Sequence, residues 1–279
     1  MTIARALTIA GSDSGGGAGI QADLKTFQEL HVFGMSAITA VTAQNTVGVQ
    51  GIYPLSVEAV LQQIDSIGLD LGTDAVKTGM LFSPEIIYGV AAKIREYAWT
   101  NLVVDPVMIA KGGSKLLQDE AVAAMKNELF PQALVVTPNM PEAEVLTGMT
   151  VRTLDDRKEA AKRLVDLGVK HVVMKGGHEE GTSQIVDLLY DGSAFVEFPS
   201  HKVLTRHTHG TGCTFAASIT AEVAKGSSVI DAVAIAKNFI HAAIEDSLEL
   251  GAGHGPTNHW AYRQRLNASA ESRKKGRLE

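Results

Sequence analysis

The residues best suited to chemistry in this sequence surround its single cysteine. Cys213 follows the turn Gly210, Thr211 and Gly212, and a pattern typical of a helix begins at Thr214. The first backbone N–H groups of a helix have no partner within the helix and attract anions, helped by the helix dipole. A thiol at this position is expected to ionise more readily than a free one. The spacing therefore predicts an anion site beside a reactive cysteine, and a buried, inert cysteine is the alternative.

Two kinds of reaction could use such a thiol. A cysteine hydrolase needs a partner histidine, and His207 and His209 lie near Cys213 in the chain, but the sequence shows no third group that would orient them. Phosphoryl transfer depends instead on positioning, a metal and stabilisation of the charge on the moving group. A thiolate could accept the proton of an attacking alcohol while the turn amides hold the phosphate. We therefore favour phosphoryl transfer.

Polar side chains follow the predicted strands at the points where those strands end. Ligands of doubly wound sheets bind at the carboxyl ends of the strands. Carboxylate and amide oxygens together with lysines suit a hydrated magnesium ion and phosphates. The candidates are Asp13, Gln44, Lys77, Asp105, Asn139, Glu142 and Lys175.

A glycine-rich stretch, GSDSGGGAG, follows the first predicted strand. Gly17, Gly19 and Ala22 fit the loose dinucleotide pattern G-x-G-x-x-A. An NAD-type oxidoreductase would have an acidic residue about 20 positions later, and residues 42–45 of this chain offer none. The sequence also lacks the P-loop pattern G-x-x-x-x-G-K-[ST]. A tight connection between strand and helix is one interpretation, but we favour backbone that approaches a ligand, because five glycines exceed what one turn requires.

Short β-rich runs alternate with helical patterns, which predicts βαβ units and a mainly parallel sheet. The predicted strands cover residues 5–11, 36–44, 74–79, 101–107, 133–139 and 171–177. The predicted helices cover residues 20–34, 56–68, 83–98, 153–168, 214–225 and 229–248. Ser56 is the expected N-cap of the second helix.

The pattern changes after residue 183. Two strand-like runs flank Asp191-Gly192, a strong signal for a hairpin, which we place near an edge of the sheet. No linker rich in Pro, Gly or Ser divides the chain. The sequence therefore predicts a doubly wound, mainly parallel α/β sheet with helices on both faces. We expect one domain over residues 1–262 and a charged, mobile tail over residues 263–279.

Composition narrows the class of protein. The formal net charge is -6 and the pI is about 5.9, which argues against a general nucleic-acid binder. An acidic chain can still bind phosphate through local amides and a metal. One cysteine cannot form an internal disulfide, and no apolar run has the length of a signal peptide or a membrane span. We expect a cytoplasmic protein that binds a small molecule, without a nucleic acid or a membrane.

Several longer motifs point to a known family. They are AGSDSGGGAGIQADLKTF, VKTGML, VVDPVM, TPNMPEAE, VVMKGGH, HGTGCTF and GHGPTNH, from about residue 6 to residue 259. Together they resemble the hydroxymethylpyrimidine and phosphomethylpyrimidine kinases of thiamine synthesis, within the ribokinase-like superfamily. The resemblance implies ATP-dependent phosphorylation of 4-amino-5-hydroxymethyl-2-methylpyrimidine and then of its monophosphate, with Mg²⁺. By analogy with relatives, it also implies a homodimer.

The resemblance assigns roles around the cysteine turn. Gly210, Thr211 and Gly212 form the expected anion hole. Cys213 stands where sugar kinases of the superfamily have an aspartate base, so it is the expected proton acceptor.

The resemblance assigns roles at the strand ends as well. Asn139 and Glu142, from the N-x-x-E motif, are expected to organise magnesium and phosphate. Asp105 belongs to the same expected network, so Asp105 and Glu142 are the expected metal ligands. Lys175 and Lys237 resemble family positions near the nucleotide, as Asn139 does.

Gln44 offers the best physical fit to an aminopyrimidine. The edge of that ring has a nitrogen acceptor beside an amino donor, and a carboxamide has the reverse pair. Met80 and Val107 are expected on the ring faces, with Gly11 and Asp23 as further substrate contacts. The alternatives are a solvated strand end for Gln44, core packing for Met80 and Val107, and a favourable interaction with the helix dipole for Asp23.

Other functions stay open. Some relatives phosphorylate pyridoxal and carry a second cysteine after D-P-V-M, where this chain has Ala110. That difference and Gln44 favour the pyrimidine, with pyridoxal or pyridoxine as an alternative main or side substrate. The segment AKGGSKLL is polar and contains glycine, as expected of a lid. A binding protein without activity would keep the pocket but would have no need for a base.

Overall fold

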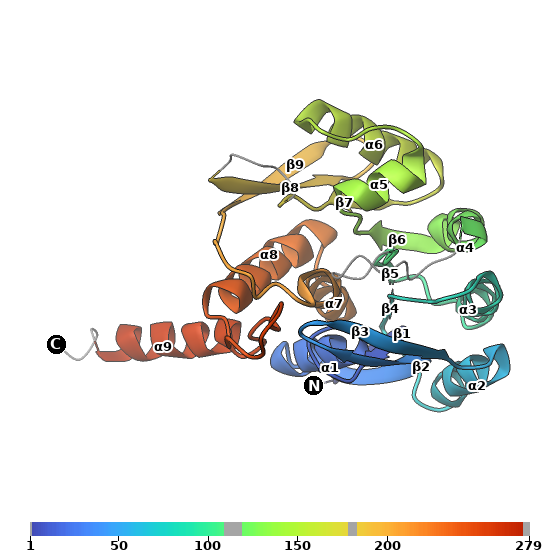
Figure 1. The fold of residues 1–279 in the computed structure, drawn as a ribbon, viewed down its shortest axis with the longest axis horizontal. Helices are drawn as coiled ribbons and strands as arrows, with labels where there is room; N and C mark the ends of the chain where they lie inside the picture. Colours follow the sequence, from blue (N-terminus) through green and yellow to red (C-terminus); the bar gives the residue numbers. More distant parts are fainter. Residues whose placement is uncertain (1, 109–118, 178–182, 276–279) are drawn as a thin grey trace.

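A single nine-stranded sheet organises the chain. The computed structural model describes residues 2–108, 119–177 and 183–275. Within them the strand order is β3-β2-β1-β4-β5-β6-β7-β8-β9 (Figure 1). The predicted doubly wound α/β fold is confirmed, because the middle strands are parallel and helices cover both faces.

The middle of the sheet is parallel from β2 to β7. Its strands are β1 (Arg5–Asp13), β2 (Phe33–Asn45), β4 (Ala75–Thr78), β5 (Leu102–Val104), β6 (Ala133–Val136) and β7 (His171–Met174). Because the strands run the same way, their carboxyl ends meet at one edge of the sheet. The polar residues that follow the strands are therefore gathered there.

Antiparallel strands close both sides of the sheet. The predicted hairpin is β8 (Gln184–Tyr190) with β9 (Phe195–His201), and Asp191 Oδ1 accepts hydrogen bonds from the backbone of Ser193 and Ala194 in its turn. A second antiparallel pair, β2 with β3 (Gly48–Pro54), was not predicted. Its sequence GVQGIYP has two glycines and a proline, which weaken the strand signal but are tolerated at an edge.

Each face of the sheet has its own apolar core. One face packs against α2 (Val57–Gly68), α3 (Pro84–Glu96), α4 (Asp119–Ala124), α5 (Met140–Thr147) and α6 (Leu154–Asp166). Short π and 3₁₀ turns, η1 (Met125–Leu129) and η2 (Phe130–Gln132), continue α4. The other face packs against α1 (Gly19–Glu29), α7 (Thr211–Ala224) and α8 (Val229–Glu245). Ser56 caps α2 as predicted, since its side chain accepts a hydrogen bond from the backbone N–H of Ala59.

The charged segment near the C-terminus is helical where the structure describes it. Helix α9 (Ala261–Lys275) follows α8 and extends away from the sheet (Figure 1). Arg265 joins it to the end of α8 through ion pairs with Glu245 and Asp246, each 2.7 Å long. The expected boundary at residue 262 therefore lies inside a helix, while the mobility of the tail stays a prediction. Among the described helices, none is both long and apolar enough for a membrane span.

Candidate active site

A cavity of about 710 Å³ lies where the strands end and α7 begins. Both the strand-end residues and the cysteine turn, which are far apart in the sequence, contribute to its wall. The predicted site residues that line it are Gly11, Gln44, Met80, Asp105, Val107, Asn139, Glu142, Lys175, Lys237, Gly210, Thr211, Gly212 and Cys213.

Asp23 is the predicted substrate contact that does not line the cavity. Its side chain is wholly buried, and Oδ2 accepts hydrogen bonds from Thr8 Oγ1 at 2.6 Å and from Lys77 Nζ at 2.8 Å. Asp23 lies on the inner side of α1, where it neutralises Lys77, and Lys77 borders the cavity. The structure thus pairs Asp23 with Lys77 at the cavity wall, and a direct contact between Asp23 and substrate stays a prediction.

The anion turn is built by close approach of two loops. Gly210 is the N-cap of α7 and has a positive φ of 81°, which favours glycine. A Cβ on Gly210 would overlap the carbonyl oxygen of Gly17 in the glycine-rich loop. Helix α7 begins at Thr211, three residues earlier than predicted, so Cys213 lies in its first turn.

Two backbone N–H groups of this turn are open. Thr214 N donates to the carbonyl of Gly210 at 2.9 Å, and Thr211 N makes only a long contact of 3.4 Å with Thr208. Within the part of the chain that the structure describes, the N–H groups of Gly212 and Cys213 have no backbone acceptor. Open N–H groups at the start of a 14-residue helix, facing a cavity, are suited to hold an anion.

The thiol beside these amides is harder to ionise than predicted. Burial is the main cause that raises the pKa of Cys213 to about 11, and the carboxylates of Asp23 and Asp105 add to the increase. Lys77 and a hydrogen bond from the Gly19 backbone act in the opposite direction. The expectation of a readily ionised thiol is therefore corrected: loss of solvation outweighs the favourable helix terminus.

A lysine and two acids lie together in the wall of the cavity. Lys175 Nζ lies 3.0 Å from Asp105 Oδ1 and 3.7 Å from Glu142 Oε2. Thr137 Oγ1 also donates to Asp105 Oδ1, at 3.2 Å. Burial would lower the pKa of Lys175, but Asp105 and Glu142 outweigh it and the net shift is upward. Lys175 is therefore a fixed positive charge, suited to a phosphate.

Glu142 is held by the start of α5. Asn139 and Glu142 form a capping box, in which Glu142 N donates to Asn139 Oδ1 at 2.9 Å and Asn139 N donates to Glu142 Oε2 at 2.8 Å. Burial raises the pKa of Glu142 to about 7, against the opposing effect of Lys175, and Asp105 raises it further. The N-x-x-E motif thus caps α5, and its expected role with magnesium and phosphate stays a prediction.

The acids fit magnesium only as part of a larger ligand set. Among the described residues, no three His, Cys, Asp or Glu side chains are close enough to hold a metal together. Mg²⁺ on nucleotide enzymes usually keeps waters and phosphates and takes one or two carboxylates. Asp105 and Glu142, which both lie within 4 Å of the Lys175 ammonium, fit such a site.

Lys237 is held by an acid that the sequence analysis did not identify. Lys237 Nζ donates to Asp187 Oδ2 at 2.7 Å, and Asp187 Oδ1 accepts from the backbone N–H of Gly176 at 2.7 Å. The pair joins α8 to β8 and lines the cavity. The available signal was a single acid within the apolar run QIVDLLY.

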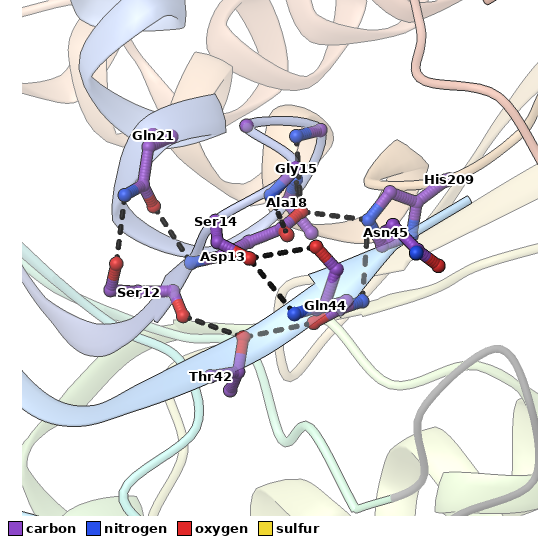
Figure 2. Close-up of polar contacts among 12 residues, drawn as sticks. Ser12, Asp13, Ser14, Gly15, Ala18, Gln21, Thr42, Gln44, Asn45 and His209 are labelled. Carbon is purple, nitrogen blue, oxygen red and sulfur yellow. Dashed lines mark hydrogen bonds and ion pairs between the residues drawn. The ribbon is translucent and has the colours of Figure 1, made fainter. Parts of the chain in front are cut away.

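Asp13 organises the glycine-rich loop, as Figure 2 shows. Its carboxylate accepts hydrogen bonds from the backbone N–H groups of Gly15, Gly17 and Ala18 at 2.8–3.0 Å, and Oδ2 lies 2.8 Å from His209 Nε2. Burial would raise the pKa of Asp13, but the bonds from His209, Ala18 and Gly15 outweigh it and lower the pKa. These loop amides therefore serve a tight connection, while Ala18 and Gly19 also line the cavity, so backbone that approaches a ligand stays a prediction.

Gln44 lies beside this loop and lines the cavity. Its Oε1 is 3.2 Å from Thr42 Oγ1, and its Nε2 is 3.4 Å from His209 Nε2 (Figure 2). The sequence near His209 showed no group that would orient it. Asp13, which precedes His209 by 196 residues, is that group. His209 is therefore directed at Asp13 and Gln44.

The predicted apolar contacts, Met80 and Val107, are part of the cavity wall. Met80 is 7% exposed and lines the cavity, and its methyl group lies where a side chain on Gly11 would be. Val107 lines the same cavity, and its backbone N–H donates to Asp105 O at 2.8 Å. Ala110 and the expected lid, residues 110–117, lie outside the described residues.

Comparison with known proteins gives the family. Residues 13–258 match the phosphomethylpyrimidine kinase family. The chain is 60% identical over 270 residues to the hydroxymethylpyrimidine/phosphomethylpyrimidine kinase of Bacillus subtilis (strain 168), covering 96% of this chain and 100% of that protein.

Solved structures agree with this match. The ADP complex of Bacillus subtilis pyridoxal kinase is 45% identical, with a TM-score of 0.88 over 94% of this chain and 99% of that chain. The phosphomethylpyrimidine kinase of Clostridium difficile 630 is 43% identical, with a TM-score of 0.78 over 87% of this chain and 100% of that chain. The sequence match, the fold and the residues around the cavity together show that this chain belongs to the phosphomethylpyrimidine kinase family.

Proposed function

We propose that the protein transfers the γ-phosphoryl group of ATP to the hydroxyl of 4-amino-5-hydroxymethyl-2-methylpyrimidine, and then to the resulting monophosphate. The observation that carries this proposal is the pair of open N–H groups at Gly212 and Cys213, in the same cavity as Gln44. An anion site and a group that matches an aminopyrimidine edge are the two features that this reaction requires.

The pyrimidine binds at the Gln44 end of the cavity. The carboxamide of Gln44 pairs with the ring nitrogen and the amino group, while Met80 and Val107 pack on the ring. Gly11 leaves room for the Met80 methyl group, because a larger residue at that position would displace it. The hydroxymethyl group then points toward the start of α7.

Transfer of the phosphoryl group from ATP to the alcohol takes place in the space between Lys175 and the cysteine turn. Phosphoryl transfer is accelerated by positioning and by charges that match those of the moving group. The N–H groups of Gly212 and Cys213 hold the transferred group, and the Lys175 ammonium attracts the phosphates of the nucleotide. Magnesium, held by Asp105 and Glu142 together with the phosphates, neutralises phosphate charge when it is bound.

Cys213 accepts the proton of the alcohol. In this structure the thiol is protonated at neutral pH, because burial raises its pKa to about 11. Lys77 is the positive charge that lowers the pKa of Cys213, so it favours the thiolate that the base requires. In a loose transition state the alcohol loses its proton late, so a base is needed only as the new P–O bond forms.

Pyridoxal or pyridoxine is the second candidate substrate. The similarity to a Bacillus subtilis pyridoxal kinase supports it, as does the hydroxymethyl group that these pyridines share with the pyrimidine. Pyridoxal carries a formyl group where the pyrimidine has its amino group, and a formyl oxygen can accept a hydrogen bond but has no hydrogen to donate to Gln44. We therefore propose pyridoxal phosphorylation as a side activity.

Turnover measured in parallel tests the function. The full chain is incubated with ATP and Mg²⁺ and with one of three acceptors: the pyrimidine alcohol, its monophosphate or pyridoxal. We expect both pyrimidines to be phosphorylated with a higher kcat/KM than pyridoxal. A higher kcat/KM for pyridoxal would contradict the proposed main substrate, and no turnover with any acceptor would contradict the proposed reaction.

We also propose that the protein is a cytoplasmic homodimer. A single cysteine suits a reducing compartment. The outer β2–β3 hairpin exposes Val41, Val47 and Tyr53 by 45%, 67% and 64%, which supports a partner on this side. Sedimentation of the full chain at several concentrations measures the oligomeric state, and a monomer at all concentrations would contradict the dimer.

A further inference from the structure

The Gln44 carboxamide lies between two polar neighbours whose hydrogens are already committed. A carboxamide keeps its shape when it rotates by about 180° and exchanges its oxygen and nitrogen, so its neighbours decide which orientation is favourable. In the orientation of Figure 2, Nε2 faces His209 Nε2 at 3.4 Å and Oε1 faces Thr42 Oγ1 at 3.2 Å. The chemistry of His209 and Thr42 therefore fixes how Gln44 binds.

His209 presents a fixed donor. Asp13 already accepts three backbone N–H bonds, so it is a carboxylate that requires a hydrogen from His209 Nε2 at 2.8 Å. This holds whether the imidazole is neutral or charged, because Nε2 carries a hydrogen in both states. The backbone of His209 is itself held by hydrogen bonds with Gly255 at 3.1 Å and Thr257 at 3.4 Å.

Thr42 presents a fixed acceptor. Its side chain is buried, and Oγ1 donates its single hydrogen to the carbonyl oxygen of Ser12 at 2.8 Å. The remaining lone pairs of Oγ1 can only accept. The nitrogen of Gln44 beside His209 therefore faces a donor, and its oxygen beside Thr42 faces an oxygen that has no hydrogen to give.

Rotation of the carboxamide resolves both conflicts at once. With Oε1 toward His209 and Nε2 toward Thr42, Oε1 accepts the long branch of a bifurcated bond from the Nε2–H that His209 gives chiefly to Asp13, and Nε2 of Gln44 donates to Oγ1 of Thr42. One lone pair of Oε1 and one hydrogen of Nε2 remain for a ligand in the cavity. Two independent contacts thus favour the same orientation.

We propose that His209 and Thr42 are positioning residues that lock the Gln44 carboxamide in this orientation, so that the protein binds 4-aminopyrimidines and rejects 4-oxopyrimidines. The inference rests on the proposed function, in which Gln44 pairs with the ring. An aminopyrimidine offers an amino donor to Oε1 and a ring-nitrogen acceptor to Nε2, whereas the oxo ring offers an acceptor and an N–H donor. The hydroxymethyl group prevents the ring from turning over, because it must reach the turn at Cys213.

The test compares the binding of two ligands that differ only at that edge. Calorimetry measures the Kd of the pyrimidine alcohol and of its 4-oxo counterpart for the full chain and its variants. For the wild type we expect a roughly 10- to 100-fold preference for the amino ligand, the range of one good bidentate pair. A free carboxamide would rotate to suit either ligand, so loss of the lock is expected to reduce the preference severalfold or more.

Matched variants separate the lock from a structural role. His209→Gln and Thr42→Ser keep a donor and a hydroxyl, so they should keep the preference to within about threefold. His209→Leu and Thr42→Val remove these groups at similar volume, so both should reduce the preference. Thermal unfolding identifies variants that fold, and either pair is sufficient for the test. Equal weakening of both ligands, with the preference unchanged, would show a merely structural role and overturn the lock.

Gln44→Ala distinguishes failure of this inference from failure of the proposed function. If Gln44→Ala retains the full preference, Gln44 does not bind the ring edge, and the proposed recognition fails together with the lock. If Gln44→Ala loses the preference while folded His209→Leu and Thr42→Val keep it, recognition stands and the lock is overturned. Neutron diffraction gives a direct readout, since deuterons of Gln44 Nε2 on the His209 side would also overturn the lock.

Discussion

Lys77 and Asp23 form an ion pair inside the protein, with both side chains fully buried and Nζ 2.8 Å from Oδ2. Burial alone would lower the pKa of Lys77, but Asp23, Cys213 and Asp105 outweigh it and raise the pKa. Lys77 therefore stays charged beside the cavity, and it lowers the pKa of the nearby Cys213 thiol. Through this pair, Asp23 in α1 helps to keep the charge on Lys77 that lowers the pKa of Cys213.

Lys77→Met is expected to reduce both stability and turnover. The substitution leaves Asp23 as an unpaired buried charge, which costs about 3–5 kcal/mol in the free energy of unfolding. The double variant Lys77→Met/Asp23→Leu removes both charges, so most of the stability should return, while turnover stays low because Cys213 has lost its cation. Urea denaturation and single-turnover rates measure the two effects. Recovery of turnover in the double variant would contradict the role of Lys77.

Cys213→Ala is expected to keep pyrimidine binding and lose most of kcat. Loss of a general base costs about 10²- to 10⁴-fold in rate, and the ground-state contacts of Gln44 are unaffected. Kd by calorimetry and kcat by coupled assay give the comparison. Cys213→Asp, which places a carboxylate at this position, is the control and should retain more activity than alanine. Turnover of the alanine variant near that of the wild type would refute the base.

Glu142 predicts a pH dependence of stability. Its pKa is raised from 4.5 to about 7, chiefly by burial, so the folded state binds its proton more tightly than the unfolded state does. The wild type should therefore lose stability as pH rises from about 4.5 to 7, and the loss is complete above that window. Glu142→Gln keeps an acceptor for Asn139 N but does not titrate, so its stability should fall less over this range. Urea denaturation at several pH values checks this, and parallel curves would contradict it.

Gly210→Ala is expected to disrupt the anion turn, with Gly226→Ala as a matched control. Both glycines have a positive φ, 81° and 86°, so alanine costs each about 1–2 kcal/mol of backbone strain. A Cβ at Gly226 meets no atom within 4 Å, whereas at Gly210 it overlaps the backbone of Gly17. Only Gly210→Ala should therefore abolish turnover. Equal activities for the two folded variants would show that the close approach of the loops is unnecessary.

The sequence was sufficient for the fold because its periodicity and its helix caps agree with tertiary structure. Alternating runs predicted the parallel strands, and Asp191-Gly192 predicted the hairpin of β8 and β9. Strand β3 was missed because Gly48, Gly51 and Pro54 suppress the local strand signal, while pairing with β2 stabilises the strand.

The strand-end rule and the motifs together identified fewer than half of the residues around the cavity, among them Gln44, Lys175 and the cysteine turn. Local patterns could not show ion pairs between distant parts of the sequence. Asp187 and Lys237, for example, are 50 residues apart. The pKa of Cys213 was misjudged for a related reason. Its helix terminus is visible in the sequence, but the atoms that bury it come from elsewhere in the fold.

The hydrogen bond between Asp13 and His209 also bears on how the protein is made, because it spans 196 residues. A nascent chain emerges N-terminus first, so the glycine-rich loop leaves the ribosome long before the histidine that completes its contacts. Contacts of such long sequence separation form late in folding. The ring-binding end of the cavity is thus assembled only after the segment that leads into α7 has emerged, and truncated chains that end before this segment cannot acquire it.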